Sequence, residues 1–189
     1  AVLIPRSETE LLVETALAWL SNRGEGPRER PTALDVGTGS GCIAVTLAAC
    51  APGLHVHATD LSPAALAVAR QNAHRHGVEP RITFHHADLL PAGLPPVDLL
   101  CANLPYIPSA TLRQLPLFGQ EPTLALDGGS EGLDVIERLL AAAPTILNPG
   151  GFAALEIEAS QGVEAAALAA RPFPAARLRV LPHLAGNDR

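Results

Sequence analysis

Lysine and methionine are both absent from this 189-residue chain, and all 13 basic residues are arginine. Without a methionine, residue 1 is not a translation start, so we expect the chain to be a fragment or a processed form. Long apolar runs are lacking too, since none approaches the ~20 residues that cross a bilayer. The first residues carry Pro5, Arg6 and Glu8, where a signal peptide has a basic start and an apolar stretch. We therefore expect a cytoplasmic protein that does not contact a membrane.

Positive charge is also scarce. The net charge is −6, and no stripe of basic residues runs along the chain. Long-range attraction to a nucleic acid backbone is thus not built into the chain as a whole, and we expect no direct nucleic acid partner. The cysteines are few, odd in number and without a C-x-x-C pair: Cys42, Cys50 and Cys101. They suit a reducing compartment and small packing roles inside the protein.

A convincing set of metal ligands is missing as well. His55 and His57 share one face of an expected strand, and His85 and His86 are adjacent. Metal sites use histidine clusters, but no cysteine or carboxylate completes a ligand set here at a suitable spacing. We therefore expect no metal and assign these histidines to the strand surface or to packing near a cofactor pocket.

What the chain does have is an alternation of helical patterns with short apolar strands. This predicts βαβ units: one α/β domain, residues 1–189, with a mostly parallel twisted sheet and helices on both faces. The sequence predicts a capping box between Ser7 and Glu10, and an N-cap at Ser62 before Pro63. Helices are expected at 7–22, 42–50, 63–77, 133–143 and 163–170. Strands are expected at 33–36, 55–59, 81–86, 97–102, 152–157 and 177–181, with a long loop at 104–129 and the usual last strand missing.

The strongest local signal is a glycine-rich turn at residues 35–41, Asp-Val-Gly-Thr-Gly-Ser-Gly, between the first strand and a helix. Glycine allows both a tight turn and close approach of backbone to a ligand. Dinucleotide sites favour G-x-G-x-x-G, whereas the third glycine here comes one residue early. The pattern resembles motif I of the Rossmann-like class I methyltransferases. That resemblance implies that S-adenosylmethionine is bound by Gly37, Thr38, Gly39, Ser40 and Gly41.

Two more expected strands end in an acidic residue. Asp60 ends the second strand, where a carboxylate can bind both ribose hydroxyls of a nucleotide. Asp88 ends the third, and the methyltransferase pattern implies a contact to the adenine amino group, with Leu89 beside the ring. Taken alone, Asp60 is equally well a helix-capping or loop aspartate, and Asp88 is equally well a solvated strand end. The ordered set, following the glycine turn, favours a nucleotide-type cofactor.

The turn Asn103-Leu104-Pro105-Tyr106 follows the fourth strand directly. In a doubly wound sheet the first and fourth strands flank the switch point where ligands bind, so we expect this turn beside the methyl group of the cofactor. The Asn103 side-chain oxygen and the Leu104 carbonyl can each accept a hydrogen bond from a target NH2 group, and Asn103 also borders the cofactor. Pro105 stiffens the turn, and Tyr106 offers a ring face to a planar substrate group. An ordinary turn of this composition is the simpler alternative.

Taken together, these motifs resemble the catalytic domain of the release-factor glutamine methyltransferases, the HemK/PrmC family. Matching stretches follow in order: Ile4–Glu10, Leu34–Ile43, Asn103–Ile107, Glu121–Gly129, Gly132–Asp134 and Gly186–Arg189. The resemblance implies methylation of the side-chain amide nitrogen (N5) of the glutamine in the Gly-Gly-Gln loop of peptide chain release factors. It also implies an N-terminal helical domain, which we expect to be absent from residues 1–189. We expect a monomer.

The chain departs from the family pattern at two positions. The family usually has proline where Leu104 and Ser7 stand. Position 104 contributes its backbone carbonyl, so leucine is compatible with activity, and the capping box gives Ser7 a structural role.

Two alternative functions stay open. Asn-Leu-Pro-Tyr also resembles the motif of ribosomal RNA adenine-N6 dimethylases, so an adenine-N6 methyltransferase of RNA or DNA is the first, although the charge disfavours it. The second is a degenerate methyltransferase fold that only binds. A methylation assay with labelled cofactor separates the three.

Overall fold

A computed structural model describes residues 8–23, 30–116, 118–119 and 121–181. Within these ranges the helices are α1 (Glu8–Asn22), α2 (Cys42–Cys50), α3 (Pro63–Arg75), α4 (Ser109–Leu112), α5 (Asp134–Ala142) and α6 (Gly162–Ala170). The strands are β1 (Thr32–Val36), β2 (His55–Asp60), β3 (Ile82–His86), β4 (Val97–Ala102) and β5 (Leu147–Leu155). Four short 3-10 turns are η1 (Glu79–Arg81), η2 (Thr123–Ala125), η3 (Ala143–Thr145) and η4 (Ala159–Gln161).

The five strands form one parallel sheet in the order β3-β2-β1-β4-β5. β1 and β4 are therefore neighbours at the point where the strand order reverses, as expected from the sequence. All six residues of β4 are buried, because a central parallel strand is covered on both faces. The expected α/β fold is confirmed.

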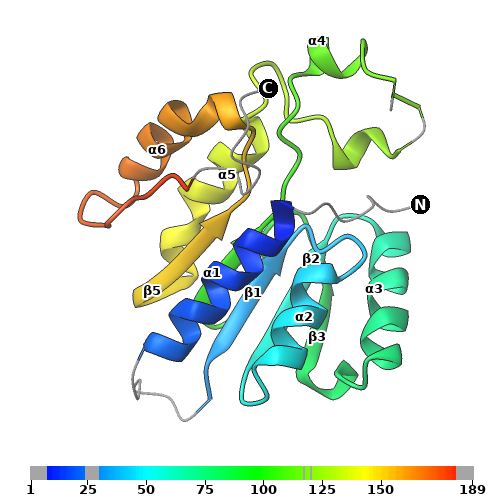
Figure 1. Cartoon of the computed structure of the whole chain (residues 1–189), viewed down its shortest axis with the longest axis vertical. Helices are drawn as coiled ribbons and strands as arrows, with labels where there is room; N and C mark the ends of the chain where they lie inside the picture. The colour runs from blue at the N-terminus through cyan, green and yellow to red at the C-terminus, as the bar shows by residue number, and fades with distance from the viewer. Residues whose placement is uncertain (1–7, 24–29, 117, 120, 182–189) are drawn as a thin grey trace.

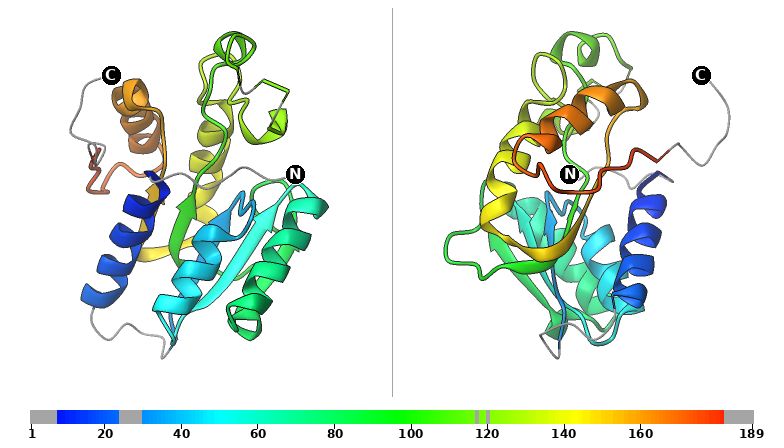
Figure 2. Two further views of the ribbon diagram at one scale, coloured as in Figure 1. Left: turned by 45° about the vertical axis from the view of Figure 1, so that its right-hand side comes forward. Right: turned by 90° about the vertical axis from the view of Figure 1, so that its left-hand side faces the viewer.

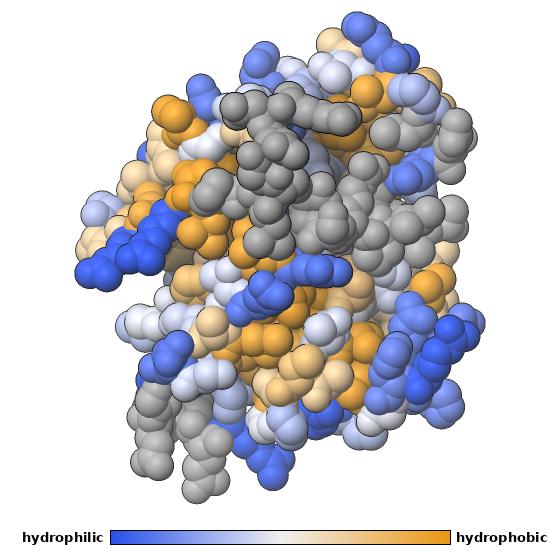
Figure 3. Space-filling view, in the orientation of Figure 1, coloured by the Kyte–Doolittle hydropathy of each residue, from blue (hydrophilic) through white to orange (hydrophobic). Residues whose placement is uncertain are grey.

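Helices cover both faces of the sheet. α1, α2 and α3 pack on one face, where Ala16, Leu47 and Val56 are fully buried or nearly so. α5 and α6 pack on the other, around Leu100 and Leu139. Figures 1 and 2 show the two helical layers, and the chain after β4 rises beyond the carboxyl ends of the strands toward α4. In the space-filling view of the same face, apolar side chains lie in the middle, over α1 and α2 (Figure 3).

Most boundaries agree with the sequence-based expectation. Ser62 caps α3 by accepting a hydrogen bond from the Ala65 amide, with Pro63 in the first turn. Gly77 adopts a φ of +67° just after this helix, which glycine tolerates. The expected loop at 104–129 also contains α4 and η2. The Ser7 side of the predicted capping box, most of the 23–31 loop and the closing motif at 186–189 lie outside the described residues.

The prediction of a sixth strand at 177–181 is wrong. These residues are exposed and form no strand, although Leu178 and Val180 alternate as strand residues do. A strand needs a hydrogen-bonded neighbour, and no described segment pairs with this one. The alternation of apolar and polar residues therefore predicted a strand for which the sheet offers no neighbour among the described residues.

The fifth strand begins earlier than predicted. Leu147 already pairs with Val97, while the next register is Leu99 with Phe152. The extra residues form a bulge around the expected Pro-Gly-Gly turn, where Gly150 has a φ of +77°. The strand ends at Leu155, and the Glu156 amide adds one more hydrogen bond, to the Ala102 carbonyl, at 2.9 Å. This bond sets Glu156 beside the residue that follows β4.

Candidate active site

The glycine turn between β1 and α2 is shaped by three left-handed backbone conformations. Gly37, Gly39 and Gly41 have φ values of +71°, +57° and +82°. A β-carbon on Gly37 would lie 2.9 Å from Leu104 Cδ2, and one on Gly41 would lie 3.0 Å from the Ala69 β-carbon. Glycine is therefore required for conformation along the turn, and for space at positions 37 and 41.

Hydrogen bonds hold this turn rigid. The Thr38 amide donates to the Thr59 carbonyl at 2.8 Å, and the Thr38 hydroxyl donates to Asp35 Oδ2 at 2.6 Å. Asn72 Nδ2 donates to the Ser40 carbonyl at 2.8 Å and so ties the turn to α3. Thr38 and Ser40 thus support the shape of the turn, which prepares it to receive a ligand without reordering.

Asp35 lies under the turn with an incomplete set of partners. Its side chain is fully buried, and Oδ2 accepts bonds from Thr38 and from the Ala44 amide at 3.1 Å. Among the described residues no donor reaches its buried Oδ1. Burial raises the pKa of Asp35 to about 7, with a smaller contribution from the Asp60 charge. A buried carboxylate with a spare oxygen suits a cationic ligand, and S-adenosylmethionine carries an ammonium and a sulfonium.

Asp60 is where the sequence predicts it, at the end of β2 against the glycine turn. Its Oδ2 accepts from the Gly39 amide and its Oδ1 from the Ser62 amide, both at 2.8 Å. Each carboxylate oxygen can accept a further bond. The side chain is half-buried, so these two oxygens can serve a pair of hydroxyl groups beside the turn.

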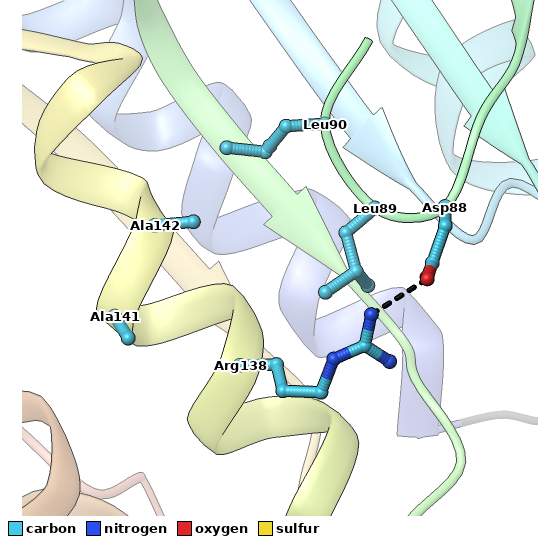
Figure 4. A pocket seen from close by; sticks show the side chains of 6 residues that line it. All are labelled: Asp88, Leu89, Leu90, Arg138, Ala141 and Ala142. Carbon is cyan, nitrogen blue, oxygen red and sulfur yellow. Dashed lines mark hydrogen bonds and ion pairs between the residues drawn. The ribbon is translucent and has the colours of Figure 1, made fainter.

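Asp88 and Leu89 lie farther along the same rim, beside α5. Asp88 Oδ2 forms an ion pair with Arg138 Nη2 at 2.6 Å, and both side chains are more than half exposed. Leu89 has a φ of +61°, a strained value for leucine, and its carbonyl accepts from the Thr59 hydroxyl at 2.9 Å. Figure 4 shows the ion pair at an open depression of about 490 Å³, lined by Asp88, Leu89, Leu90, Arg138, Ala141 and Ala142.

The Asn-Leu-Pro-Tyr turn lies directly against the glycine turn. The buried Leu104 side chain covers Gly37, and the Asn103 carbonyl is 3.9 Å from where a Gly37 β-carbon would be. Asn103, Pro105 and Tyr106 are half-buried. The structure thus brings the two turns together on one rim of the sheet, which is the arrangement that methyl transfer to a substrate at Asn103 requires.

The Asn103 carboxamide is held through its nitrogen. Nδ2 donates to Glu156 Oε2 at 2.9 Å and to the Thr9 hydroxyl oxygen at 3.0 Å. The Tyr106 hydroxyl donates to the other oxygen of the same carboxylate, Oε1, at 3.2 Å. Among the described residues no donor reaches Asn103 Oδ1 or the Leu104 carbonyl, so both can accept hydrogen bonds from a substrate.

Sequence reasoning missed Glu156 and Thr9. Glu156 follows β5 as Asn103 follows β4, and the strand-end argument that singled out Asp60 would have found it had the strand been ended at Leu155 in place of residue 157. Thr9 gave no such signal, because a threonine in the first turn of a helix looks like part of a cap. Its partner is 147 residues away in the sequence.

The long segment after Tyr106 folds back onto the turn. The Gln161 side-chain amide donates to the Tyr106 carbonyl at 2.9 Å. Asp127 Oδ1 accepts from the Ser109 hydroxyl at 2.5 Å and the Gly129 amide at 3.0 Å, and these bonds lower the pKa of Asp127. The Ile107 amide donates to the Leu126 carbonyl and the Gly128 amide donates to the Ile107 carbonyl, so the end of the Glu121–Gly129 stretch lies beside the residue that follows Tyr106. Beside it lies a second open depression of about 450 Å³, with Leu124 exposed at its edge.

The histidines and the helices bear on metal binding and on membrane insertion. Within the described residues, no three histidine, cysteine or acidic side chains cluster as metal ligands do. His57 and His85 instead contact each other at 3.1 Å, and burial lowers the pKa of His57 to about 4. No helix in the described part of the chain has the length and apolar character to span a membrane.

Known proteins resemble this chain in sequence and in structure. A family model for a methyltransferase domain matches residues 33–116. The chain is 47% identical to the release factor glutamine methyltransferase of Moorella thermoacetica, covering 100% of this chain and 66% of that protein. It is 37% identical to that of Bacillus anthracis, covering 100% and 67%. The chain therefore spans about two thirds of the length of these relatives.

Among solved structures, the ribosomal protein L11 methylase from Lactobacillus delbrueckii subsp. bulgaricus has the same fold. Its TM-score is 0.63 at 21% identity, over 90% of this chain and 71% of that one. At that level of identity the match concerns the arrangement of strands and helices alone.

Proposed function

This chain belongs to the release factor glutamine methyltransferase family, with its Rossmann-like class I fold, and from that premise we propose that it methylates a glutamine side chain in peptide chain release factors. The acceptor atom is the amide nitrogen, N5, of the glutamine in the Gly-Gly-Gln motif. One observation carries the proposal: Asn103 binds the protein through its nitrogen and keeps its oxygen available, beside the glycine turn.

The residues around the glycine turn fit S-adenosylmethionine, the cofactor of this family. The turn from Gly37 to Gly41 has no side chain at the positions where space is limiting, and Asp35 supplies a buried oxygen without a partner. Asp60 would bind the ribose hydroxyls, and Asp88 with Leu89 would contact the adenine. When bound, the cofactor supplies a methyl group on a sulfonium, activated for displacement.

The chain's own contribution is to position a weak nucleophile. An amide nitrogen has its lone pair delocalised, so it attacks slowly unless it is held in line with the methyl carbon. Asn103 Oδ1 and the Leu104 carbonyl each accept one hydrogen of the substrate NH2, which fixes the nitrogen and favours its pyramidal form. Tyr106 stacks on the planar amide and Pro105 stiffens the turn. The nitrogen loses a proton to water only after methylation has made it acidic, so no strong base is needed.

The test is a methylation assay with the full chain and radiolabelled cofactor. A release factor, its Gln→Ala variant in the Gly-Gly-Gln motif, and structured RNA are offered in parallel. Label on the release factor alone, lost in the variant and absent from RNA, is the expected result. Label on RNA would replace the proposal with adenine methylation. Cofactor binding without transfer to any substrate would replace it with a binding role.

A further inference from the structure

Glu156 and Thr9 form a clamp on Asn103, joining the ends of β5 and β4 to the first turn of α1. We propose that this clamp fixes which way the Asn103 carboxamide points, and so presents its oxygen to the substrate amide. The role in catalysis rests on the proposed function. The orientation itself does not, and it can be tested without any substrate.

The chemistry of the clamp permits one orientation. An ionised glutamate offers only acceptors, so the side of the Asn103 carboxamide that faces Glu156 has to be the NH2 group. The Thr9 hydroxyl donates a hydrogen bond to Glu156 Oε2, at 2.8 Å. The Thr9 oxygen can therefore accept a hydrogen bond from Asn103. Both hydrogens of the Asn103 NH2 group therefore have acceptors, at 2.9 and 3.0 Å.

A reversed Asn103 carboxamide would lose its hydrogen bonds both to Glu156 and to the substrate. It would bring its oxygen against the Glu156 carboxylate and leave its NH2 group facing the substrate NH2, donor against donor. A free asparagine has no such preference, since its oxygen and nitrogen ends are nearly the same in size. The clamp supplies the preference, and it does so before substrate arrives.

The clamp is built to stay in place. Thr9 is 5% exposed, and Glu156 is bound through its backbone amide to the Ala102 carbonyl, the residue just before Asn103. The Tyr106 hydroxyl donates to the remaining carboxylate oxygen. Glu156 thus acts through Asn103 and Tyr106, which makes it a positioning residue.

The first experiment observes Asn103 directly, by 15N NMR of its side-chain amide in the chain without ligands. The signal is assigned by its loss in Asn103→Asp. We expect two distinct protons that exchange slowly with water, in contrast to the exposed Gln71. Thr9→Val removes one acceptor and Glu156→Leu removes the other, so each variant should speed the exchange. The matched control is Thr15→Val, because among the described residues the Thr15 hydroxyl bonds to the Leu11 carbonyl alone, within α1.

The second experiment measures methyl transfer. Thr9→Val and Glu156→Leu should lower kcat roughly 10- to 100-fold, the size seen when a residue that orients a ligand is removed. The affinity for S-adenosylhomocysteine and the urea midpoint of Thr9→Val should stay close to those of Thr15→Val. In the Asn103→Ala background Thr9→Val should have no further effect on kcat, since Thr9 contacts the substrate-binding turn through the Asn103 side chain.

Clear results would overturn the proposal. Asn103 protons that exchange as fast as those of Gln71 would show that no clamp exists. Glutamine methylation that proceeds at an unchanged rate in Thr9→Val and Glu156→Leu would remove the catalytic role and leave the proposed function standing. If the Asn103 protons are protected but the chain methylates no substrate, the proposed function falls and the orientation of Asn103 by the clamp stands. If Glu156→Leu does not fold, Thr9→Val carries both tests alone.

Discussion

Replacing Gly37 by alanine tests the contact between the two turns. The residue has a φ of +71°, where a β-carbon costs about 1–2 kcal/mol. The new methyl would also lie 2.9 Å from Leu104 Cδ2, in a side chain only 5% exposed that has little room to move. Overpacking of this kind costs about 1–3 kcal/mol more, so Gly37→Ala should lower the free energy of unfolding by about 2–5 kcal/mol.

Gly39→Ala is the matched control. Its φ is +57°, yet the atom nearest to a new β-carbon is 3.9 Å away, so only the backbone cost of about 1–2 kcal/mol applies. Urea unfolding of both variants gives the two free energies, and the difference between them measures the overlap with Leu104.

A third variant isolates Leu104. In Gly37→Ala/Leu104→Ala the clash is gone, so the double variant should lose about 1–3 kcal/mol less than the two single losses combined. The reasoning is refuted if Gly37→Ala is no less stable than Gly39→Ala, or if the two effects are simply additive.

Two further predictions concern charges around the cofactor. Burial raises the pKa of Asp35 from 3.8 to about 7, so its ionisation should destabilise the fold as the pH rises from 4 to 7, by up to about 4 kcal/mol. Asp35→Asn keeps an acceptor for Thr38, so its free energy of unfolding in urea should rise relative to that of the wild type between pH 4 and 7. Parallel plots of the two free energies against pH would contradict this. Asp88→Ala should weaken S-adenosylhomocysteine binding roughly tenfold by calorimetry. Arg138→Ala should leave that affinity undiminished and change stability by less than about 1 kcal/mol, because the ion pair is exposed; equal losses in the two variants would contradict the assignment.

The sequence predicts local features of this fold well where one residue type has one physical use. Glycines at positions of positive φ, Ser62 before Pro63, and the apolar run of β4 each determine their own conformation. Parallel strands then place their carboxyl ends on one rim, which is why Asp60 and Asn103 could be assigned to a common site from their positions alone.

The failures have a common physical origin in long-range pairing. Leu178 and Val180 alternate like strand residues, but whether they form a strand depends on a neighbour that their own sequence does not specify. The early start of β5 depends on β4 accepting a bulge. Thr9 belongs to the site because α1 docks beside β5, which no local pattern reveals.

The position of Thr9 also links the orientation of Asn103 to the end of a helix. Helix ends open more readily than strands at the centre of a sheet, and Thr9 is in the first turn of α1. Each time that turn frays, Asn103 loses one of its two anchors while the sheet, the glycine turn and Asp60 remain intact. The orientation of Asn103 therefore depends on the local opening of a few residues, which costs less free energy than unfolding of the whole protein.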